Sequence, residues 1–358
     1  MMSKDFFRDM VKQIGDVDTH IADDGMHSSE FAGTMDTGSY LLNAALSGSI
    51  YGGVPNNKIT VFAGESATGK TFFVLGLVQQ FLKDNPDAGV IYYDTEAAVT
   101  KEMFVARGID PRRVIISEQA TVQSFRTHAM RILDNYLKVP EKERPKMLMV
   151  LDSLGQLSTE KEIEDISEGK NTRDMTRSQL IRGAFRALSL KLARANVSLL
   201  VTNHIFNVIG AYVPTKDMGG GEGLKYAASQ VVFLSKKKDR DGTEVVGNII
   251  HCRLAKSRFT KENKSIDVRL SYDDGLNRYY GLLDLAEKHA IIKKVANRFE
   301  MPDGGKFYGK QIEEDPDRFF TKELLDAIDV VAGKEFKYGQ GQMTENDDEE
   351  VDTESAIS

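Results

Sequence analysis

The chain has 358 residues, of which 41% are hydrophobic and 28% are charged, with a formal net charge of −7 and one cysteine. This length and composition are typical of a globular protein with room for two or three domains. The lone Cys252 excludes an internal disulfide and fits a reducing compartment, no apolar run is long enough to span a bilayer, and the N-terminus predicts no signal peptide. We therefore expect a cytoplasmic protein that does not contact membranes.

The first 30 residues predict a short helix followed by a linker. A helix over residues 3–14 would place five apolar side chains on one side: Phe6, Phe7, Met10, Val11 and Ile14. Such a short helix is marginal alone and needs a surface, which is either its own domain or a neighbouring subunit. Residues 15–30 are polar and predict a loop. We assign residues 1–30 to oligomerisation as a hypothesis.

Residues 31–280 predict one α/β domain. Apolar runs typical of buried strands occur at 59–63, 89–93, 114–117, 147–151 and 197–202. Amphipathic patterns predict helices at 71–83, 122–137 and 176–195. Because strands and helices alternate, we expect a mostly parallel central sheet with helices on both faces. Strand patterns at 231–238, 245–256 and 265–271, with a turn at 239–242, predict an antiparallel extension.

The rest of the chain predicts a small domain and a tail. Residues 281–340 read as a small α+β C-terminal domain, with helices near 282–290 and 321–332. Seven acidic residues fall between positions 345 and 354, and no Lys or Arg follows Lys337, so we expect residues 341–358 to be a disordered acidic tail. Without these seven charges the chain is nearly neutral, so its acidity does not argue against nucleic-acid binding.

A P-loop pattern lies between the first predicted strand and the helix after it. The pattern G-x-x-x-x-G-K-[ST] is matched by Gly64, Glu65, Ser66, Ala67, Thr68, Gly69, Lys70 and Thr71. Glycines let the backbone turn its N–H groups toward an anion, and the helix N-terminus adds partial positive charge. In such a loop Lys70 reaches the β- and γ-phosphates and Thr71 ligates Mg²⁺. We expect this segment to bind a nucleoside triphosphate.

Two other predicted strands end in carboxylates. Asp152 follows strand 147–151, where P-loop proteins place a carboxylate in the Mg²⁺ shell, although such a residue can also merely cap a turn. Asp94 and Glu96 follow strand 89–93, where a carboxylate can orient and deprotonate an attacking water. We choose Glu96 for this role, but the spacing alone does not separate it from Asp94.

Several short patterns resemble the RecA-type recombinases in their type and order. They lie at 37–46, 64–71, 94–96, 151–153, 201–204, 219–229, 255–258 and 272–275. Together they cover about residues 34–290. Each pattern is weak alone, but eight in the same order are specific, and the acidic tail most resembles bacteriophage members of this family.

The resemblance implies an ATP- and Mg²⁺-dependent enzyme of an infected bacterial cell. Such an enzyme forms an open helical filament on single-stranded DNA and exchanges strands with duplex DNA. The matching positions make Glu96 the catalytic carboxylate and Asp152 the Mg²⁺-associated residue, and they put His204 in the place of a γ-phosphate sensor. They also imply that Lys256 and Arg258 reach ATP across the subunit interface and that Tyr272 lies near the base. Expected partners are a recombination mediator and a single-strand DNA-binding protein.

Two residues depart from the family pattern. His204 replaces the usual Gln, and because imidazole titrates near pH 6.5, we expect ATP–DNA coupling to be more pH-sensitive here. Met103 stands where the bacterial protein has an aromatic residue at the base, which leaves adenine selectivity open.

Two polar stretches, 158–174 and 206–222, are candidate DNA loops at the edge where α/β proteins bind ligands. The first also carries Lys161, and the second is rich in glycine, which allows close approach to a phosphodiester. The expected DNA contacts are Lys170, Arg173, Arg177, Arg182, Arg186, Phe206, Tyr212 and Lys216. On the residues alone, solvated loops and a solvated helix face explain them equally well, and the resemblance favours DNA.

Two alternative functions share the predicted ATP residues. The first is a ring-forming, helicase-like motor, against which the Gly-rich second stretch argues. The second is a nucleotide-switched assembly protein whose hydrolysis is incidental.

Overall fold

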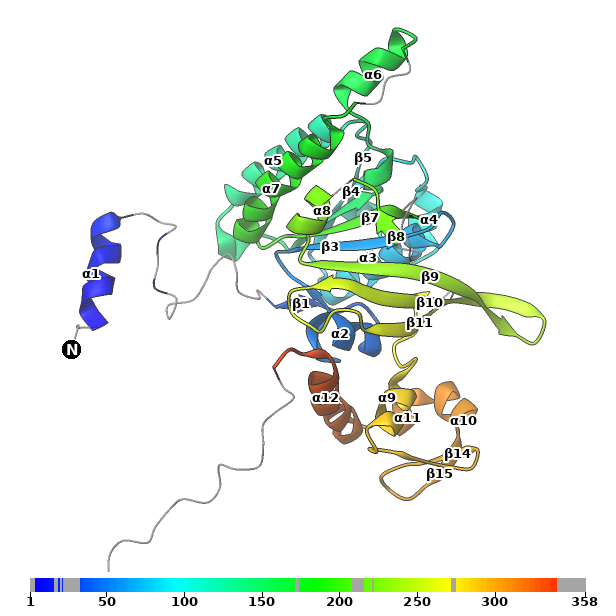
Figure 1. The fold of residues 1–358 in the computed structure, drawn as a ribbon. Coiled ribbons are helices and arrows are strands. Elements are labelled where there is room, and N and C mark those ends of the chain that lie inside the picture. The colour runs from blue at the N-terminus through cyan, green and yellow to red at the C-terminus, as the bar shows by residue number, and fades with distance from the viewer. Residues whose placement is uncertain are drawn as a thin grey trace, which may run out of the picture.

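The computed structural model describes residues 4–15, 19, 21, 33–170, 174–207, 216–220, 222–271 and 275–339 (Figure 1). A large twisted sheet runs through the body, helices lie against both of its faces, and a small group of C-terminal elements packs below it. The α/β fold class predicted from the sequence is confirmed.

The parallel part of the sheet contains six strands in the order β9-β3-β7-β6-β4-β5. Their bounds are β3 (Ile59–Gly64), β4 (Gly89–Asp94), β5 (Val114–Ser117), β6 (Met147–Asp152), β7 (Ser198–Asn207) and β9 (Gln230–Asp241). Successive side chains point to opposite faces, so Phe62 and Tyr92 enter one apolar cluster while Val61 and Tyr93 enter the other. Burial of these strands on both faces explains their continuous apolar runs.

The sheet continues through an antiparallel extension made of β9, β10 (Glu244–Ser257), β11 (Ser265–Ser271) and β12 (Gly275–Leu276). The turn that joins β9 to β10 lies at residues 242–243 rather than at the expected 239–242, because β9 continues to Asp241, and this long hairpin projects from the body (Figure 1). A short strand, β8 (Lys216–Met218), pairs with the end of β7. Cys252 is fully buried in β10, and burial raises the pKa of its thiol.

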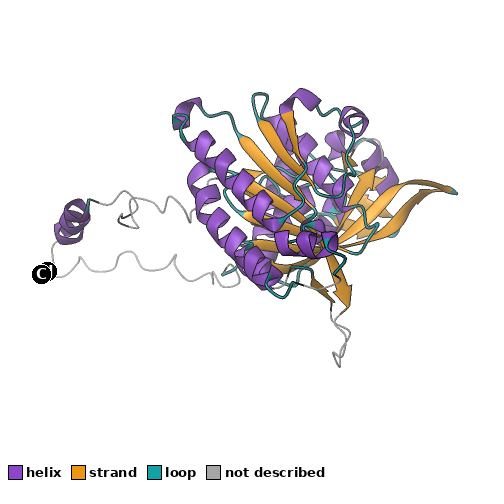
Figure 2. Cartoon of the chain, turned by 90° about the horizontal axis from the view of Figure 1, so that it is seen from above, coloured by secondary structure: helices purple, strands orange, loops and turns teal. Residues whose placement is uncertain are grey.

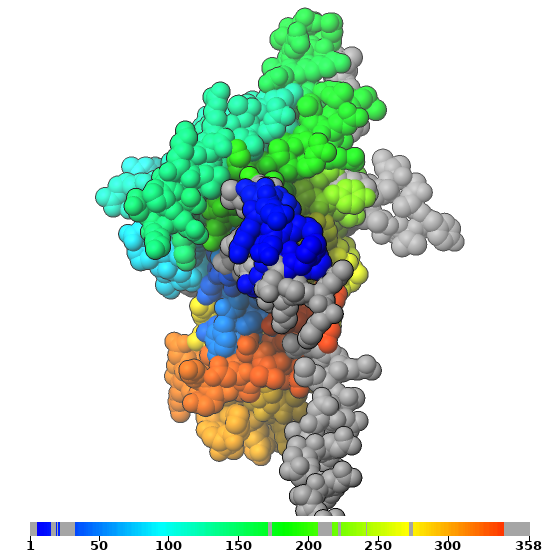
Figure 3. All heavy atoms as spheres, turned by 90° about the vertical axis from the view of Figure 1, so that its left-hand side faces the viewer, coloured from blue at the N-terminus to red at the C-terminus, as the bar shows by residue number. Residues whose placement is uncertain are grey.

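Helices cover both faces of the sheet (Figure 2). The cluster on one face contains side chains of α2 (Tyr40–Ser47) and α3 (Lys70–Asp84). The cluster on the other face contains side chains of α5 (Val122–Leu137), α7 (Arg177–Ala195) and α8 (Glu222–Ala227). The short helix α4 (Lys101–Val105) follows β4. Helix α6 (Glu160–Ser167) projects from the top of the body (Figures 1 and 3).

The C-terminal elements combine a three-stranded antiparallel sheet with four helices. They are α9 (Leu282–Lys288), β13 (Lys293–Val295), β14 (Arg298–Glu300), β15 (Lys306–Tyr308), α10 (Gly309–Glu314), α11 (Pro316–Phe319) and α12 (Lys322–Phe336). Their apolar side chains join the cluster that contains α2 and α3. Asp329 of α12 accepts hydrogen bonds from the Ser49 hydroxyl and the Ile50 amide, both at 2.7 Å. A domain boundary near residue 280 therefore stays a prediction.

The N-terminal helix α1 (Lys4–Ile14) stands apart from the body (Figure 1). Its apolar side chains Phe6, Phe7, Met10 and Ile14 are exposed. A two-stranded sheet of β1 (Thr34–Met35) and β2 (Val54–Pro55) lies beside α2. Within the described part of the chain, every helix is too short or too polar to cross a membrane.

The predicted strands and long helices are present, with ends shifted by a few residues, and the described parts of two expected loops contain regular elements. The stretch 158–174 contains α6, whose N-terminus is closed by a reciprocal capping box between Thr159 and Glu162. The stretch 206–222 begins inside β7, which runs on to Asn207, and includes β8 and the start of α8. Side-chain capping and strand pairing stabilise these segments despite their polarity.

Candidate nucleotide and nucleic-acid sites

The carboxyl edge of the parallel sheet brings together residues from four strands. Register pairs Gly64 of β3 with His204 of β7, and Asp94 of β4 with Asp152 of β6. Ligands of open α/β sheets bind at this edge. Four of the predicted sequence patterns therefore meet in one place.

The P-loop connects β3 to the N-terminus of α3. Ala67 and Gly69 adopt positive φ values of 58° and 92°, which turn the backbone into a tight loop. Thr68 closes this loop by donating its hydroxyl to the Glu65 carbonyl at 2.7 Å. A β-carbon on Gly64 would lie 2.9 Å from the Leu234 carbonyl oxygen, so only glycine fits between β3 and β9 here. The loop and the 15-residue helix behind it form an anion cradle.

Lys70 folds back over the loop with its ammonium group largely buried. Its Nζ atom donates to the Gly64 carbonyl at 3.1 Å and the Glu65 carbonyl at 3.0 Å, and it lies 3.4 Å from Nδ1 of His204. Burial lowers the pKa of Lys70, while the charges of Glu96 and Asp152 oppose this shift. The cation is thus held where an incoming phosphate would meet it.

Asp152 is buried at the end of β6 and faces the P-loop region. Its Oδ2 accepts from the Tyr92 hydroxyl at 2.7 Å, and its Oδ1 accepts from the Thr202 hydroxyl. These bonds fix the carboxylate at the carboxyl edge, close enough for its charge to act on Lys70 in the first turn of α3. Within the described residues, no three metal-ligating side chains cluster. One carboxylate and one hydroxyl suit Mg²⁺, which keeps several waters and phosphate oxygens as ligands.

Asp94 and Glu96 have different hydrogen-bond partners in the structure. Asp94 accepts from three backbone amides, those of Glu96 and Ala98 at 3.2 Å and that of Val99 at 3.0 Å, so it caps the loop after β4. Glu96 instead accepts from the Ser153 hydroxyl at 2.6 Å and lies 3.3 Å from Nε2 of His204. Burial alone would raise the pKa of Glu96, but these hydrogen bonds and the nearby charges lower it. The geometry favours Glu96 as the carboxylate that faces a water.

His204 links the nucleotide edge to the second polar stretch. Its ring lies between Lys70 and Glu96, and the Asn203 side chain donates to the Gly219 carbonyl at 2.6 Å. The Gly219 amide in turn donates to the His204 carbonyl at 2.9 Å. The Gly219 backbone is thus hydrogen-bonded to the two residues of β7 that include His204.

A groove of about 470 Å³ lies between the start of α7 and the β7–β8 hairpin. Its lining includes Met175, Arg177, Phe206, Gly219 and Gly220. The Met175 and Phe206 side chains are 84% and 52% exposed, as expected for side chains that stack on bases. The groove thus brings two of the expected DNA residues, Arg177 and Phe206, close together.

Arg177 is less available than the sequence suggested. Its guanidinium group donates to the Leu157 carbonyl at 2.9 and 3.2 Å and to the Gly155 carbonyl at 3.0 Å. These bonds make it a positioning residue for the turn after β6. Arg182 and Arg186 are exposed farther along α7 and keep a free path to solvent.

The other expected DNA residues divide into two groups. Lys170 is exposed just after α6 and pairs with Glu168. Lys216 begins β8, and only its backbone position is described. Arg173 and Tyr212, like the base-side Tyr272, lie outside the described residues.

Lys256 and Arg258 lie at the opposite, amino edge of the sheet. Arg258 donates its amide to the Ser229 carbonyl at 3.1 Å, and Ser229 donates to the Ile59 carbonyl at the start of β3. The Lys256 ammonium caps the C-terminal end of α8 by donating to the Lys225 carbonyl at 2.7 Å and the Ala228 carbonyl at 2.8 Å. Burial lowers the pKa of Lys256, and the nearby charge of Arg258 lowers it further.

A second cavity, of about 360 Å³, adjoins the P-loop and was not predicted from the sequence. Its lining includes Gly69, Phe72, Arg107, Ser271 and Gly275. The Arg107 guanidinium lies 4.4 Å from the centre of the Phe72 ring and also donates to the Met103 carbonyl. Phe72 resembles any apolar helix residue, and Arg107 belongs to no sequence pattern. Only the fold therefore reveals that the two side chains pack together as a flat surface, the Phe72–Arg107 platform. Ser271 and Gly275 flank the predicted base residue Tyr272.

The P-loop, the Asp152 carboxylate and the parallel strand order define a P-loop nucleotide-binding protein. Residues 6–277 match the family described as the RecA N-terminal domain. The chain belongs to the RecA family, so the resemblance inferred from the sequence is confirmed.

Named relatives agree with this assignment. The recombination and repair protein of Enterobacteria phage T4 is 31% identical over 257 residues, which span 72% of this chain but only 64% of the phage protein, less than two thirds. Protein RecA of Streptomyces rimosus is 26% identical over 272 residues, 75% of this chain and 68% of that protein. Protein RecA of Chloroherpeton thalassium is 25% identical over 311 residues, 86% of this chain and 81% of that protein.

Proposed function

We propose that this protein is a DNA-dependent ATPase that assembles as an open helical filament on single-stranded DNA and pairs it with homologous duplex DNA. One observation carries the proposal: the residues expected to act on the triphosphate lie at two opposite edges of the sheet. Lys70, Glu96 and Asp152 occupy the carboxyl edge. Lys256 and Arg258 occupy the amino edge.

The distance between the two edges excludes action on one nucleotide within a single protomer. Strand β3 contains six residues, and at ~3.3 Å per residue it separates its two ends by about 20 Å. An extended Lys or Arg side chain reaches only roughly 6 Å beyond its Cα. The two sets of residues can therefore meet at one triphosphate only when protomers stack head to tail, an arrangement that grows into an open helix unless its rotation closes into a ring.

Two apolar surfaces support self-association. Strand β5 is an edge of the large sheet, and its Ile115 and Ile116 are 57% and 42% exposed. An exposed apolar edge strand favours pairing with another chain. Helix α1 also exposes its apolar side, which needs a partner surface. We propose that both features contact neighbouring protomers.

In this mechanism the carboxyl edge binds and orients the triphosphate. The P-loop amides and Lys70 would hold the phosphates, Glu96 would accept a proton from the attacking water, and the Phe72–Arg107 platform would stack on the base. Thr71 and Asp152 would hold Mg²⁺, which, when bound, neutralises phosphate charge. Lys256 and Arg258 of the next protomer would stabilise the charge that develops during hydrolysis, as arginine fingers do.

Contacts with the γ-phosphate would be transmitted to DNA through two connections. Within a protomer, hydrogen bonds join His204 and Asn203 to Gly219 beside the groove. Across the seam, Lys256 and Arg258 would connect the neighbour's nucleotide to α8, because both side chains donate to carbonyls at the C-terminal end of this helix. Hydrolysis would weaken both connections and release the DNA.

The names of the relatives support this proposal, since one is called a recombination and repair protein and the others RecA. We extend it to a bacteriophage protein that acts in the host cytoplasm with a mediator and a single-strand binding protein. The test combines the ATPase rate with and without single-stranded DNA and a strand-exchange assay. We expect both DNA stimulation and strand exchange, and the absence of both would contradict the proposal.

The two alternatives predict different outcomes. A ring-forming motor would give closed rings rather than long filaments in electron micrographs with ATP and DNA. An assembly protein with incidental hydrolysis would keep its biological activity in the Glu96→Gln variant. The open groove with Gly219 and Gly220 favours the recombinase.

A further inference from the structure

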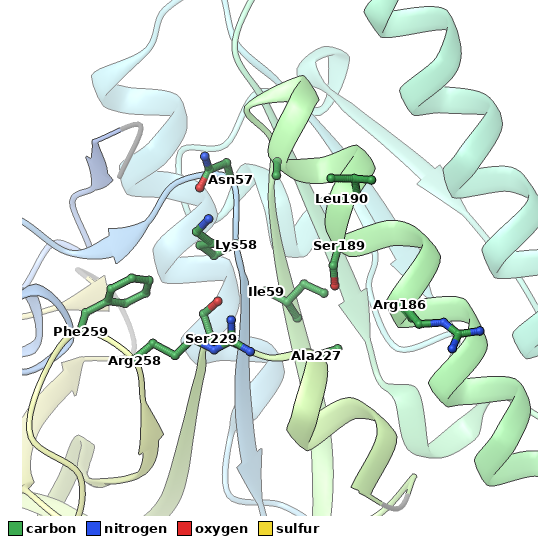
Figure 4. A pocket seen from close by; sticks show the side chains of 11 residues that line it. Asn57, Lys58, Ile59, Arg186, Ser189, Leu190, Ala227, Ser229, Arg258 and Phe259 are labelled. Carbon is green, nitrogen blue, oxygen red and sulfur yellow. The ribbon is translucent and has the colours of Figure 1, made fainter. Parts of the chain in front are cut away.

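A cavity of about 350 Å³ opens at the amino edge of the sheet (Figure 4). Lys58, Arg258, Ser189 and Ser229 belong to its wall. Among the described residues that line it, none carries a carboxylate. Two cationic groups and hydroxyls on the same wall suit an anionic ligand.

Arg186 also belongs to this wall, but it does not complete the cation pair. Figure 4 shows its guanidinium group directed away from Lys58 and Arg258. Arg186 therefore remains a candidate for the DNA side of α7. The anionic ligand would meet Lys58 and Arg258.

Lys58 directly precedes β3, the strand whose other end forms the P-loop. It therefore lies about 20 Å from its own phosphate cradle, the length of a six-residue strand. Its ammonium group cannot reach the nucleotide of its own protomer. Any triphosphate that it binds must belong to a neighbour.

The burial of Lys58 and its nearness to the charge of Arg258 also favour an anionic ligand. Burial is the main cause that lowers the pKa of Lys58, and the charge of Arg258 lowers it further. A phosphate placed between the two groups would interact favourably with both positive charges.

We propose that Lys58 is a further binding residue for the triphosphate of the neighbouring protomer, acting beside Arg258. This inference rests on the proposed function, because it needs head-to-tail protomers with a nucleotide between them. The ammonium group would donate to phosphate oxygens, with hydroxyls of the cavity wall as secondary donors.

The experiment is a complementation assay with Lys58→Ala and Lys70→Ala proteins. Lys58→Ala should lower the DNA-stimulated ATPase rate about tenfold, as expected for one lost charge-assisted contact. It should leave binding of a fluorescent ATP analogue to the monomer unchanged, because its P-loop is intact. Lys83→Ala, an exposed lysine at the end of α3, is the matched control and should behave as wild type.

Mixing the two variants tests whether Lys58 acts across the seam. In an equimolar mixture, about one seam in four combines an intact P-loop from Lys58→Ala with an intact amino edge from Lys70→Ala. We expect the mixture to recover about a quarter of the wild-type rate, well above the mean of the separate variants. A variant that merely misfolds would not be rescued.

The parallel mixture of Arg258→Ala with Lys70→Ala distinguishes failure of the proposed Lys58 role from failure of the shared nucleotide site. Rescue there, without rescue of Lys58→Ala, would overturn the role of Lys58 alone. A Lys58→Ala protein with the wild-type rate would overturn it as well. Failure of both mixtures would contradict the shared nucleotide site itself.

Discussion

The two edges of the central sheet differ in the charged groups that they present. At the carboxyl edge, Lys70, Glu96 and His204 form one hydrogen-bonded group that contains both signs of charge. At the amino edge, Lys58 and Arg258 face a cavity whose described lining contains no carboxylate. In the proposed mechanism the first edge binds and hydrolyses a nucleotide, and the second meets the nucleotide of a neighbouring protomer. Each protomer would therefore contribute one half to each of two shared sites.

Removal of the amino-edge arginine should have the largest effect. Arg258→Ala is expected to lower the DNA-stimulated ATPase rate about 1,000-fold, the lower range for arginine fingers. Binding of ATP to the free monomer should not change, because Arg258 lies at the other edge. Steady-state kinetics and analogue titration measure the two quantities, with the 90% exposed Arg112→Ala as control. An equal loss of monomer binding would show that the edges are not independent.

Glu96→Gln tests the carboxyl edge. We expect the ATPase rate to fall about 100-fold or more, as for the loss of a general base, while ATP and DNA binding persist. Asp94→Asn is the matched control, because its amide oxygen can still accept from the Glu96 and Ala98 amides and only the bond to the Val99 amide is lost. If Asp94→Asn lowered the rate as much as Glu96→Gln, the assignment of roles would be reversed.

The lowered pKa of Glu96 also sets the sign of a pH effect. A group with a lowered pKa keeps its ionised form above its folded-state pKa and loses it as the pH falls through that value. The loss of ATPase rate that protonation of Glu96 causes should therefore occur below pH 4.5, the ordinary pKa of a glutamate. Ser153→Ala removes a hydrogen bond that lowers this pKa, so it should move this loss of rate to higher pH.

The cavity beside the P-loop should decide how tightly the base is bound. Phe72→Ala is expected to raise the KM for ATP about tenfold, because base–aromatic stacking contributes about 1–3 kcal/mol. The inhibition constant of inorganic tripolyphosphate as a competitor should not change, since it lacks a base. Equal weakening of both ligands would place Phe72 in the phosphate site instead.

His204→Gln addresses the connection from the nucleotide to DNA. Because His204 contacts both Lys70 and Glu96, we expect its replacement to lower the stimulation of the ATPase rate by DNA a few-fold. The ATPase rates of wild type and variant are compared with and without single-stranded DNA at fixed salt. Equal stimulation of the two proteins would exclude His204 from the coupling.

The smallest effect should come from the acidic C-terminal segment. A tethered polyanion competes with DNA for cationic surfaces at high effective concentration. Deletion of residues 344–358 should strengthen binding to single-stranded DNA a few-fold at low salt and have no effect at high salt. Identical binding isotherms at low salt would favour a role in docking a partner protein.

The sequence predicted the phosphate-binding residues of the carboxyl edge far better than the residues that line the two cavities. The P-loop, Asp152 and Glu96 are local patterns on buried strands, and apolar runs such as 59–63 mark those strands clearly. Lys58, Phe72 and Arg107 belong to no local pattern, because tertiary packing alone brings them to a cavity. Arg177 shows the reverse case, since an apparent DNA contact turns out to hold backbone carbonyls.

The most direct test is a structure of the filament formed with single-stranded DNA and a non-hydrolysable ATP analogue. We predict that the γ-phosphate lies between Lys70 and Glu96 of one protomer and Arg258, Lys256 and Lys58 of the next. A nucleotide enclosed by one protomer, with these three cations directed elsewhere, would contradict the account.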